Sequence, residues 1–201
     1  VNYDVISIEV GQTFRPGIAS FYTTEFYQHA RARLRPDGIL SQFVPLSFFT
    51  TDEFCAVIKT FLEVFPTSVL WYNMSECLLI GSVSDELKLS PDRLSMLSQN
   101  EQLHEDLKYA HWGGPAQWLN QPDFFLAGFL MGPTGLANMV VDASSYHDDR
   151  PYLEYTTNIY GSGAEQSIVA MIRLHLEPVE MVLSSPEGTQ FDHDIESICL
   201  Q

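Results

Sequence analysis

The chain has 201 residues, of which 45% are hydrophobic and 12% aromatic, so it can bury a core and is not a disordered polypeptide. Its 26 acidic and 10 basic residues give a formal charge of −16, which repels a phosphate backbone and argues against nucleic-acid binding. A small cationic amine would be attracted instead. No stretch approaches the roughly 20 apolar residues that a membrane-spanning helix needs.

The first 82 residues alternate between strand and helix patterns. Residues 3–9 form a β-rich, nearly continuous apolar run, which is typical of a strand covered on both faces of a parallel sheet. Apolar residues then recur at helical spacing over residues 20–34, and Pro-Asp-Gly at residues 36–38 is expected to stop that helix. A second strand is predicted at residues 39–44.

The next helix has the clearest signature. Thr50 is followed three residues later by Glu53, which is a capping box, and apolar residues up to position 65 trace one face. Strands follow at residues 68–72 and 77–81, joined by a short polar turn that permits only an antiparallel hairpin. This order predicts an α/β fold, and by analogy the C-terminal half of a Rossmann-like, class I methyltransferase-type sheet, whose last strand runs antiparallel to the rest.

Beyond Ser82 the pattern changes, so we predict two domains, at residues 1–82 and 83–201. The second is acidic, with 18 of the 26 acidic side chains, and mainly helical. Helices are expected at residues 91–99, 101–110, 116–119, 123–131, 134–140 and 165–176. A loop is expected at residues 142–155, where an Asp149–Arg150 pair would clamp it onto the sheet. The tail from residue 177 is expected to be partly mobile.

No metal or redox site is indicated. Cys55, Cys77 and Cys199 lie far apart and form no C-x-x-C pair. We therefore expect buried, reduced thiols, which fit a reducing, cytoplasmic compartment. Two clusters of His and Asp, at residues 147–149 and 192–194, lack the spacing of metal ligands, so loop capping and solvated acids are the favoured interpretations.

Several segments carry a family resemblance. They are Tyr-Asp-Val-Ile at residues 3–6, Glu9, Phe-Tyr-Thr-Thr-Glu-Phe-Tyr at 21–27, Leu-x-Pro-x-Gly-Ile at 34–39, Gln42, and Asp-Asp-Arg-Pro-Tyr-Leu-Glu-Tyr at 148–155. Together they resemble spermidine and spermine synthases, most closely the bacterial branch fused to membrane-spanning segments. Where that branch has Glu-Pro-Ser-Asn-Pro-Trp, residues 9–14 read Glu-Val-Gly-Gln-Thr-Phe, so that only the acid is retained.

The resemblance implies site residues for aminopropyl transfer. Glu9 would be the base that takes a proton from an amine, which then displaces the aminopropyl group of decarboxylated S-adenosylmethionine. An amine that is protonated at pH 7 is no nucleophile until a carboxylate removes its proton. Gln12 stands where the synthases place a second, diamine-holding acid, and Gln42 and Tyr72 would line the same cleft. The alternatives are a solvated strand-end carboxylate for Glu9 and a core or interface position for Tyr72.

The resemblance also implies that part of the fold lies elsewhere. Nothing before Tyr3 supplies the Gly-rich loop and the acid with which Rossmann-type transferases hold a nucleoside. We therefore expect a C-terminal fragment that is inactive alone and holds no cofactor, from a parent that uses decarboxylated S-adenosylmethionine or S-adenosylmethionine. Membrane attachment would come only from parent segments absent here. The strand at residues 3–9 would have an unpaired edge, so a homodimer is expected.

Two alternatives remain open. The parent could be a non-catalytic, transferase-like binding or assembly domain of a membrane-anchored protein, in keeping with the altered residues after Glu9. It could also be an S-adenosylmethionine-dependent methyltransferase.

Overall fold

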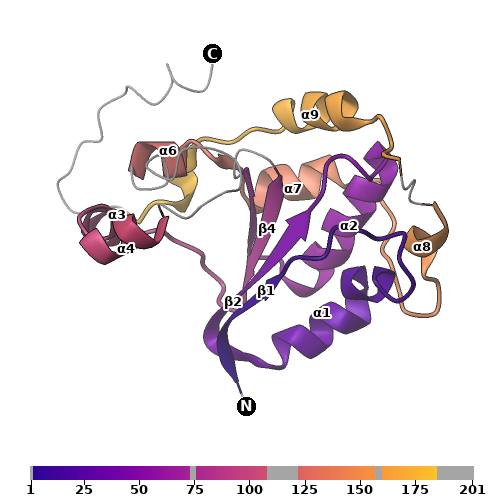
Figure 1. The fold of residues 1–201 in the computed structure, drawn as a ribbon, viewed down its shortest axis with the longest axis horizontal. Helices are drawn as coiled ribbons and strands as arrows, with labels where there is room; N and C mark the ends of the chain where they lie inside the picture. The colour runs from indigo at the N-terminus through magenta and orange to yellow at the C-terminus, as the bar shows by residue number, and fades with distance from the viewer. Residues whose placement is uncertain (1, 73–75, 108–121, 157–159, 185–201) are drawn as a thin grey trace.

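The structure, a computed structural model, describes residues 2–72, 76–107, 122–156 and 160–184. Within these residues, five strands form one mixed sheet in the order β1-β2-β4-β3-β5, with helices packed on it, and the predicted α/β class is confirmed (Figure 1). The strands are β1 (Tyr3–Ile8), β2 (Leu34–Val44), β3 (Ser68–Tyr72), β4 (Cys77–Ser82) and β5 (Phe129–Met131). The predicted helix at residues 116–119, Cys199 and the cluster at residues 192–194 lie outside the described residues.

The sheet combines parallel and antiparallel pairs. β1 and β2 are parallel, with Ile8 opposite Gln42, whereas β4 runs antiparallel to both β2 and β3 and lies between them. The predicted hairpin and its antiparallel last strand are therefore confirmed. The short link between β3 and β4 leaves β4 no other course than to return along β3.

The start of β2 differs from the prediction. The strand begins at Leu34 rather than at residue 39, and residues 36–38 are part of it. Leu34 pairs with Tyr3 and Ile39 pairs with Val5, so the residues between them bulge out of the ladder. A bulge tolerates a proline, which has no N–H to donate.

β1 lies at an edge of the sheet. Within the described residues it pairs only with β2, and Val5 is 56% and Tyr3 50% exposed. The prediction that this strand is covered on both faces is therefore wrong for this structure. The helices α1 (Thr24–Arg31) and α2 (Thr51–Val64) lie on one face only, where they bury Ile8.

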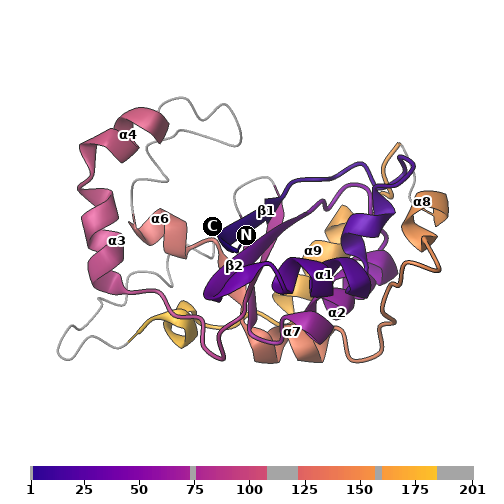
Figure 2. The ribbon, with the colours of Figure 1, turned by 90° about the horizontal axis from the view of Figure 1, so that it is seen from below.

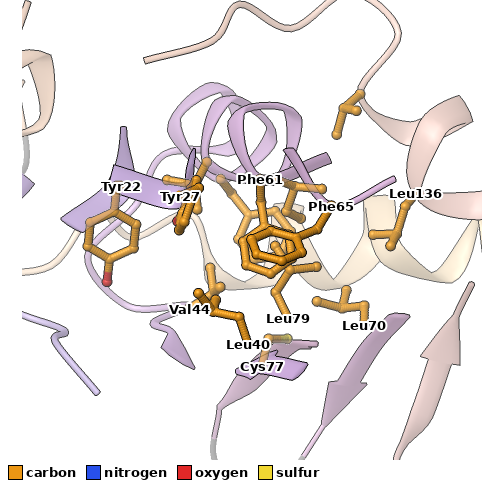
Figure 3. Packing of buried hydrophobic residues seen from close by; sticks show 14 of the residues in the cluster. Tyr22, Tyr27, Leu40, Val44, Phe61, Phe65, Leu70, Cys77, Leu79 and Leu136 are labelled. Carbon is orange, nitrogen blue, oxygen red and sulfur yellow. The ribbon is translucent and has the colours of Figure 1, made fainter. Parts of the chain in front are cut away.

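The N-terminal helices begin at side-chain caps. The predicted helix at residues 20–34 is divided into a 3-10 turn, η1 (Ala19–Tyr22), and α1, because the Thr23 side chain accepts a hydrogen bond from the Phe26 N–H and caps α1. The predicted capping box is confirmed, since Thr50 and Glu53 bond to each other's backbone N–H at the start of α2. The rings of Tyr27, Phe61 and Phe65 then pack against one another between these helices and the sheet (Figure 3).

The later helices lie around this sheet. They are α3 (Pro91–Ser98), α4 (Glu101–Leu107), α6 (Pro122–Leu126), α7 (Pro133–Met139), α8 (Tyr152–Thr156), α9 (Glu165–Arg173) and the 3-10 turn η2 (Val179–Val182). Leu136 of α7 and Ile168 of α9 belong to the core beneath α2, whereas α6 and η2 enclose Trp71 on the opposite face. Figure 2 shows α3 and α4 at one end of the molecule and α8 at the other.

The predicted helix at residues 123–131 is only half right. It ends at Leu126, and Phe129–Met131 form strand β5, antiparallel to β3. The Tyr72 N–H donates to the Gly128 carbonyl at 2.6 Å, and a Cβ at Gly128 would lie 2.4 Å from the Tyr72 oxygen. Glycine permits this close approach. The hydrogen bonds between β5 and β3 therefore decide the structure here, although the apolar residues have helical spacing. Within the described ranges, no helix is long and apolar enough to cross a membrane.

Candidate functional site

The loop at residues 9–18 leaves β1 and runs against the end of β2. The Tyr22 hydroxyl donates a hydrogen bond to the Val10 carbonyl, and its oxygen lies 3.4 Å from the Phe43 carbonyl oxygen. Gly11 lies against the Phe43 ring, so close that a Cβ at Gly11 would be 2.9 Å from a ring carbon. The start of the loop is thus held to the carboxyl end of β2, the region in which open α/β sheets bind ligands.

The predicted site residues differ in accessibility. Glu9 and Gln12 are exposed, and Tyr72 at the end of β3 is 39% exposed. Gln42 has no exposed surface, since its Oε1 accepts from the Tyr27 hydroxyl at 3.5 Å and its Nε2 donates to the Phe43 carbonyl at 3.1 Å. The fold brings the ends of β1 and β2 side by side, whereas β4 separates β2 from Tyr72.

Glu76, which no motif in the sequence singles out, also lies at this edge of the sheet. Glu76 directly precedes β4, and its Oε2 accepts a hydrogen bond from the Leu46 N–H at 3.2 Å. Burial raises the pKa of Glu76, although the Leu46 N–H partly opposes that rise. Its place in the polar hairpin turn was the available signal, because the order β2-β4-β3 puts the first residues of β4 beside the last ones of both neighbours.

The two segments that carry the family resemblance meet around the start of α1. Thr23 Oγ1 donates to Asp148 Oδ1 at 2.6 Å, and the Asp148 N–H donates to Glu25 Oε2 at 3.1 Å. His147 Nδ1 lies 3.1 Å from Glu25 Oε1, and the Thr24 N–H donates to the Tyr146 carbonyl at 3.0 Å. Residues more than 120 positions apart in the chain therefore form one hydrogen-bonded unit.

The prediction that Asp149 and Arg150 clamp their loop onto the sheet is wrong. Both residues are exposed, and no ion pair joins them in the described part of the chain. Their neighbours hold the segment instead, through Asp148 and through Leu153, which is 1% exposed in the core. The loop thus turns Asp149 outward while the residues beside it bond to α1.

A further contact ties the downstream segment to the loop after Glu9. The Gly17 N–H donates to Glu154 Oε1 at 2.5 Å. Gly17 has φ of +82°, a left-handed conformation that L side chains rarely adopt. The loop is therefore attached near both of its ends, at Val10 through Tyr22 and at Gly17 through Glu154.

An acidic groove of about 1230 Å³ lies beside this unit. Its lining includes five carboxylates, from Glu25, Asp52, Glu53, Asp142 and Asp149. None of Glu9, Gln12, Gln42 and Tyr72 lines it. Among the described residues, no three His, Cys, Asp or Glu side chains are grouped so that they could hold a metal ion.

Two cysteines are described, and both are free thiols. Burial, followed by a nearby Asp52, raises the pKa of Cys55 to about 11, and burial, followed by Glu76, raises the pKa of Cys77 to about 12. Both thiols are therefore protonated at neutral pH and are poor nucleophiles or metal ligands.

The hydrogen bonds to the Glu25 carboxylate should make stability depend on pH. Burial would raise the pKa of Glu25, but hydrogen bonds from backbone N–H groups and His147 prevail and lower it. The carboxylate therefore stabilises the folded state above its ordinary pKa of 4.5, and that contribution is lost as pH falls through the lowered pKa. The Glu25 side chain is 39% exposed, so solvent screening limits the effect.

Glu25→Gln should lower Tm by about 1–3 °C at pH 7 and by almost nothing at about pH 3, as thermal unfolding would show. Asp149→Asn, which changes an exposed acid of the same segment, should alter Tm little at either pH. An equal Tm difference for Glu25→Gln at both pH values would contradict the assignment.

Comparisons with known proteins show a distant structural likeness. The sequence matches no protein-family model and no curated protein. Among solved structures, a probable spermidine synthase from Corynebacterium glutamicum is similar, with a TM-score of 0.44 and 17% identity. The match covers 72% of this chain and 47% of that chain, so it spans about half the length of that protein.

Proposed function

We propose that the chain is the carboxy-terminal part of a spermidine-synthase-like transferase in which Glu9 is the general base. The observation that carries the proposal is the exposed Glu9 carboxylate at the carboxyl end of β1, beside the parallel strand β2. Glu9 accepts the proton of an attacking ammonium group. The freed amine then forms a bond to the aminopropyl carbon of decarboxylated S-adenosylmethionine, whose C–S bond breaks and leaves a neutral thioether.

The contact between distant segments supports this proposal. The segments at residues 21–27 and 148–155, on which the resemblance rests, are joined by the Thr23–Asp148 and Glu25–Asp148 hydrogen bonds. Short motifs that contact each other in the fold are harder to explain as chance matches than motifs that lie apart. The sheet edge with Glu9 and Glu76 is also acidic, as a site for a cationic amine should be.

The remaining site residues have separate roles in the proposal. Gln12 and Tyr72 are exposed and are the predicted contacts to the amine. A substrate role for Gln42 stays a prediction, because its amide is engaged by Tyr27 and Phe43. The aminopropyl donor is a substrate, and within the described residues no strand leads through a Gly-rich loop into a helix that could hold its nucleoside. In this proposal, the nucleoside site lies outside the described residues.

A second candidate is a non-catalytic, transferase-like binding or assembly domain. The observations that favour it are the amide of Gln12 in place of an acid and the buried amide of Gln42. In either case we propose a reducing, cytoplasmic setting, which the free thiols of Cys55 and Cys77 fit. The proposal also makes the chain part of a membrane-anchored protein.

Calorimetric titration of the full-length protein distinguishes these candidates. Binding of decarboxylated S-adenosylmethionine and putrescine supports the aminopropyltransferase. Binding of S-adenosylmethionine but not of its decarboxylated form would indicate a methyltransferase. No binding of any of the three ligands would favour the non-catalytic domain.

We infer that the 201-residue chain pairs with a second copy along β1. The edge of β1 lacks a neighbouring strand within the described residues, and Val5 is 56% exposed on it. An apolar, unpaired edge is a template for strand addition. Sedimentation should give a dimer, and Val5→Lys should raise the dissociation constant by roughly tenfold or more. Val141→Lys, at a 72% exposed loop position, is the matched control and should leave the dimer intact. A monomeric unaltered chain would contradict the pairing.

A further inference from the structure

Glu9 lies between two fixed points of the backbone. On its amino-terminal side, Ile8 is the last residue of β1, pairs with Gln42 of β2 and is 7% exposed in the main core. On its carboxyl-terminal side, the Val10 carbonyl accepts a hydrogen bond from the Tyr22 hydroxyl. Glu9 is the single residue between these two points, so the direction in which its carboxylate leaves the sheet depends on both of them.

The chain after Ile8 has left the β-ladder. Residues 9–12 have no regular secondary structure, and Gly11 gives the backbone there a wide range of conformations. The Val10 side chain packs against the main core but is only partly buried. The next buried residue of the loop is Thr13, further along the chain. The hydrogen bond from Tyr22 to Val10 is thus the directional contact that lies nearest to Glu9 on this side.

Tyr22 is itself held in place. Its side chain has no exposed surface within the main core, and its ring packs edge-on against Phe49, with the centroids 5.9 Å apart (Figure 3). The Gln42 side chain forms a hydrogen bond with Tyr22. Burial raises the pKa of Tyr22 and outweighs that hydrogen bond, which lowers it. The hydroxyl therefore keeps its proton at neutral pH and donates it to the Val10 carbonyl.

We propose that Tyr22 is a positioning residue, which holds the Val10 carbonyl so that Glu9 presents its carboxylate at the carboxyl end of β1. This role rests on the function proposed for Glu9. Tyr22 has no exposed surface, so it acts on the reaction only through the backbone beside Glu9. Gln42, which is also fully buried, supports the same hydroxyl from β2.

Backbone dynamics test the contact without any assay of activity. In the 201-residue chain, the Val10 and Gly11 amides should have NMR order parameters of about 0.85, which are typical of a rigid backbone. Tyr22→Phe keeps the buried ring and removes only the hydroxyl, so the fold should persist while these values fall toward the roughly 0.6 of a flexible segment.

Ser68→Ala is the matched control for this measurement. Ser68 has no exposed surface, and its hydroxyl donates to a backbone carbonyl in the same way, but it belongs to β3, which β4 separates from β2. Its removal should leave the order parameters of Val10 and Gly11 unchanged. Values that Tyr22→Phe does not lower, or values already near about 0.6 in the unaltered chain, would overturn the proposal.

Kinetics of the full-length protein test the positioning role. Tyr22→Phe should lower kcat for aminopropyl transfer roughly tenfold while KM for the donor stays constant, because a misplaced base slows the reaction without weakening substrate binding. Ser68→Ala should retain full kcat. In the Glu9→Gln background no base remains to be positioned, so adding Tyr22→Phe should change the residual kcat by less than about twofold.

Two kinetic results would contradict the positioning role. One is an unaltered kcat in Tyr22→Phe, and the other is an equal loss of kcat with and without the Glu9 carboxylate, which would show that the hydroxyl does not act through Glu9. If the full-length protein transfers no aminopropyl group although the order parameters change as expected, the proposed function is rejected, and the positioning role with it.

Discussion

Replacing Phe61 by alanine is expected to lower the free energy of unfolding by about 3–5 kcal/mol. Phe61 has no exposed surface, and its ring lies 4.9 Å from the Tyr27 ring and 5.1 Å from the Phe65 ring, measured between centroids (Figure 3). A Cβ at Gly81 of β4 would come within 2.6 Å of a Phe61 ring carbon. The ring thus fills the space between α2 and the sheet, and its loss would leave a cavity bounded by two fixed elements.

Denaturant unfolding of the 201-residue chain measures this effect. Tyr155→Ala is the matched control, because Tyr155 is 83% exposed and its removal should change the free energy of unfolding by no more than about 0.5 kcal/mol. If Phe61→Ala costs no more than the control, the rings do not form the centre of the core. The assigned packing of α2 on β4 would then be incorrect.

Local signals in the sequence predicted much of the fold. The Thr50 and Glu53 side chains satisfy N–H groups within one turn of helix, so four neighbouring residues contain the whole interaction. The hairpin of β3 and β4 is similar, because the short link decides its antiparallel direction. The α/β class of the first 82 residues followed from such features, whereas the specific topology was an analogy.

Other elements depend on contacts that no local pattern contains. Residues 129–131 continue the helical spacing of the apolar residues before them, but hydrogen bonding to β3 makes them a strand. The first residues of β2 look like a helix stop, yet pairing with Tyr3 keeps them extended. Pairing with a distant strand decided the outcome in both cases, and strand pairing is the least local of the interactions that build a fold.

The site could be predicted only in part. The resemblance suggested Glu9 as the base, and the strand pattern placed it at the carboxyl end of β1. The burial of Gln42 depends on Tyr27 of α1, and the bond from Gly17 to Glu154 joins residues 137 positions apart. The position of Gln42 on a strand does not show that its side chain faces a helix. Residue spacing does not show that the loop with Gly17 bonds to a segment as distant as that of Glu154.

The role of Glu9 should appear as a large loss of turnover. A carboxylate that removes a proton from the attacking amine typically contributes roughly 10²–10⁴-fold to the rate, and an amide cannot replace it. Glu9→Gln changes neither the size of the side chain nor its exposed position, so the fold should persist. Asp149→Asn, in an exposed acid away from the loop, is the control and should retain full activity.

The most direct measurement is aminopropyl transfer from decarboxylated S-adenosylmethionine to putrescine by the full-length protein and its Glu9→Gln variant. We predict transfer by the unaltered protein and a fall in kcat of roughly 10²–10⁴-fold in the variant, with binding of the donor retained. Transfer by the variant at a rate within tenfold of the unaltered protein would contradict the assignment of Glu9 as the base.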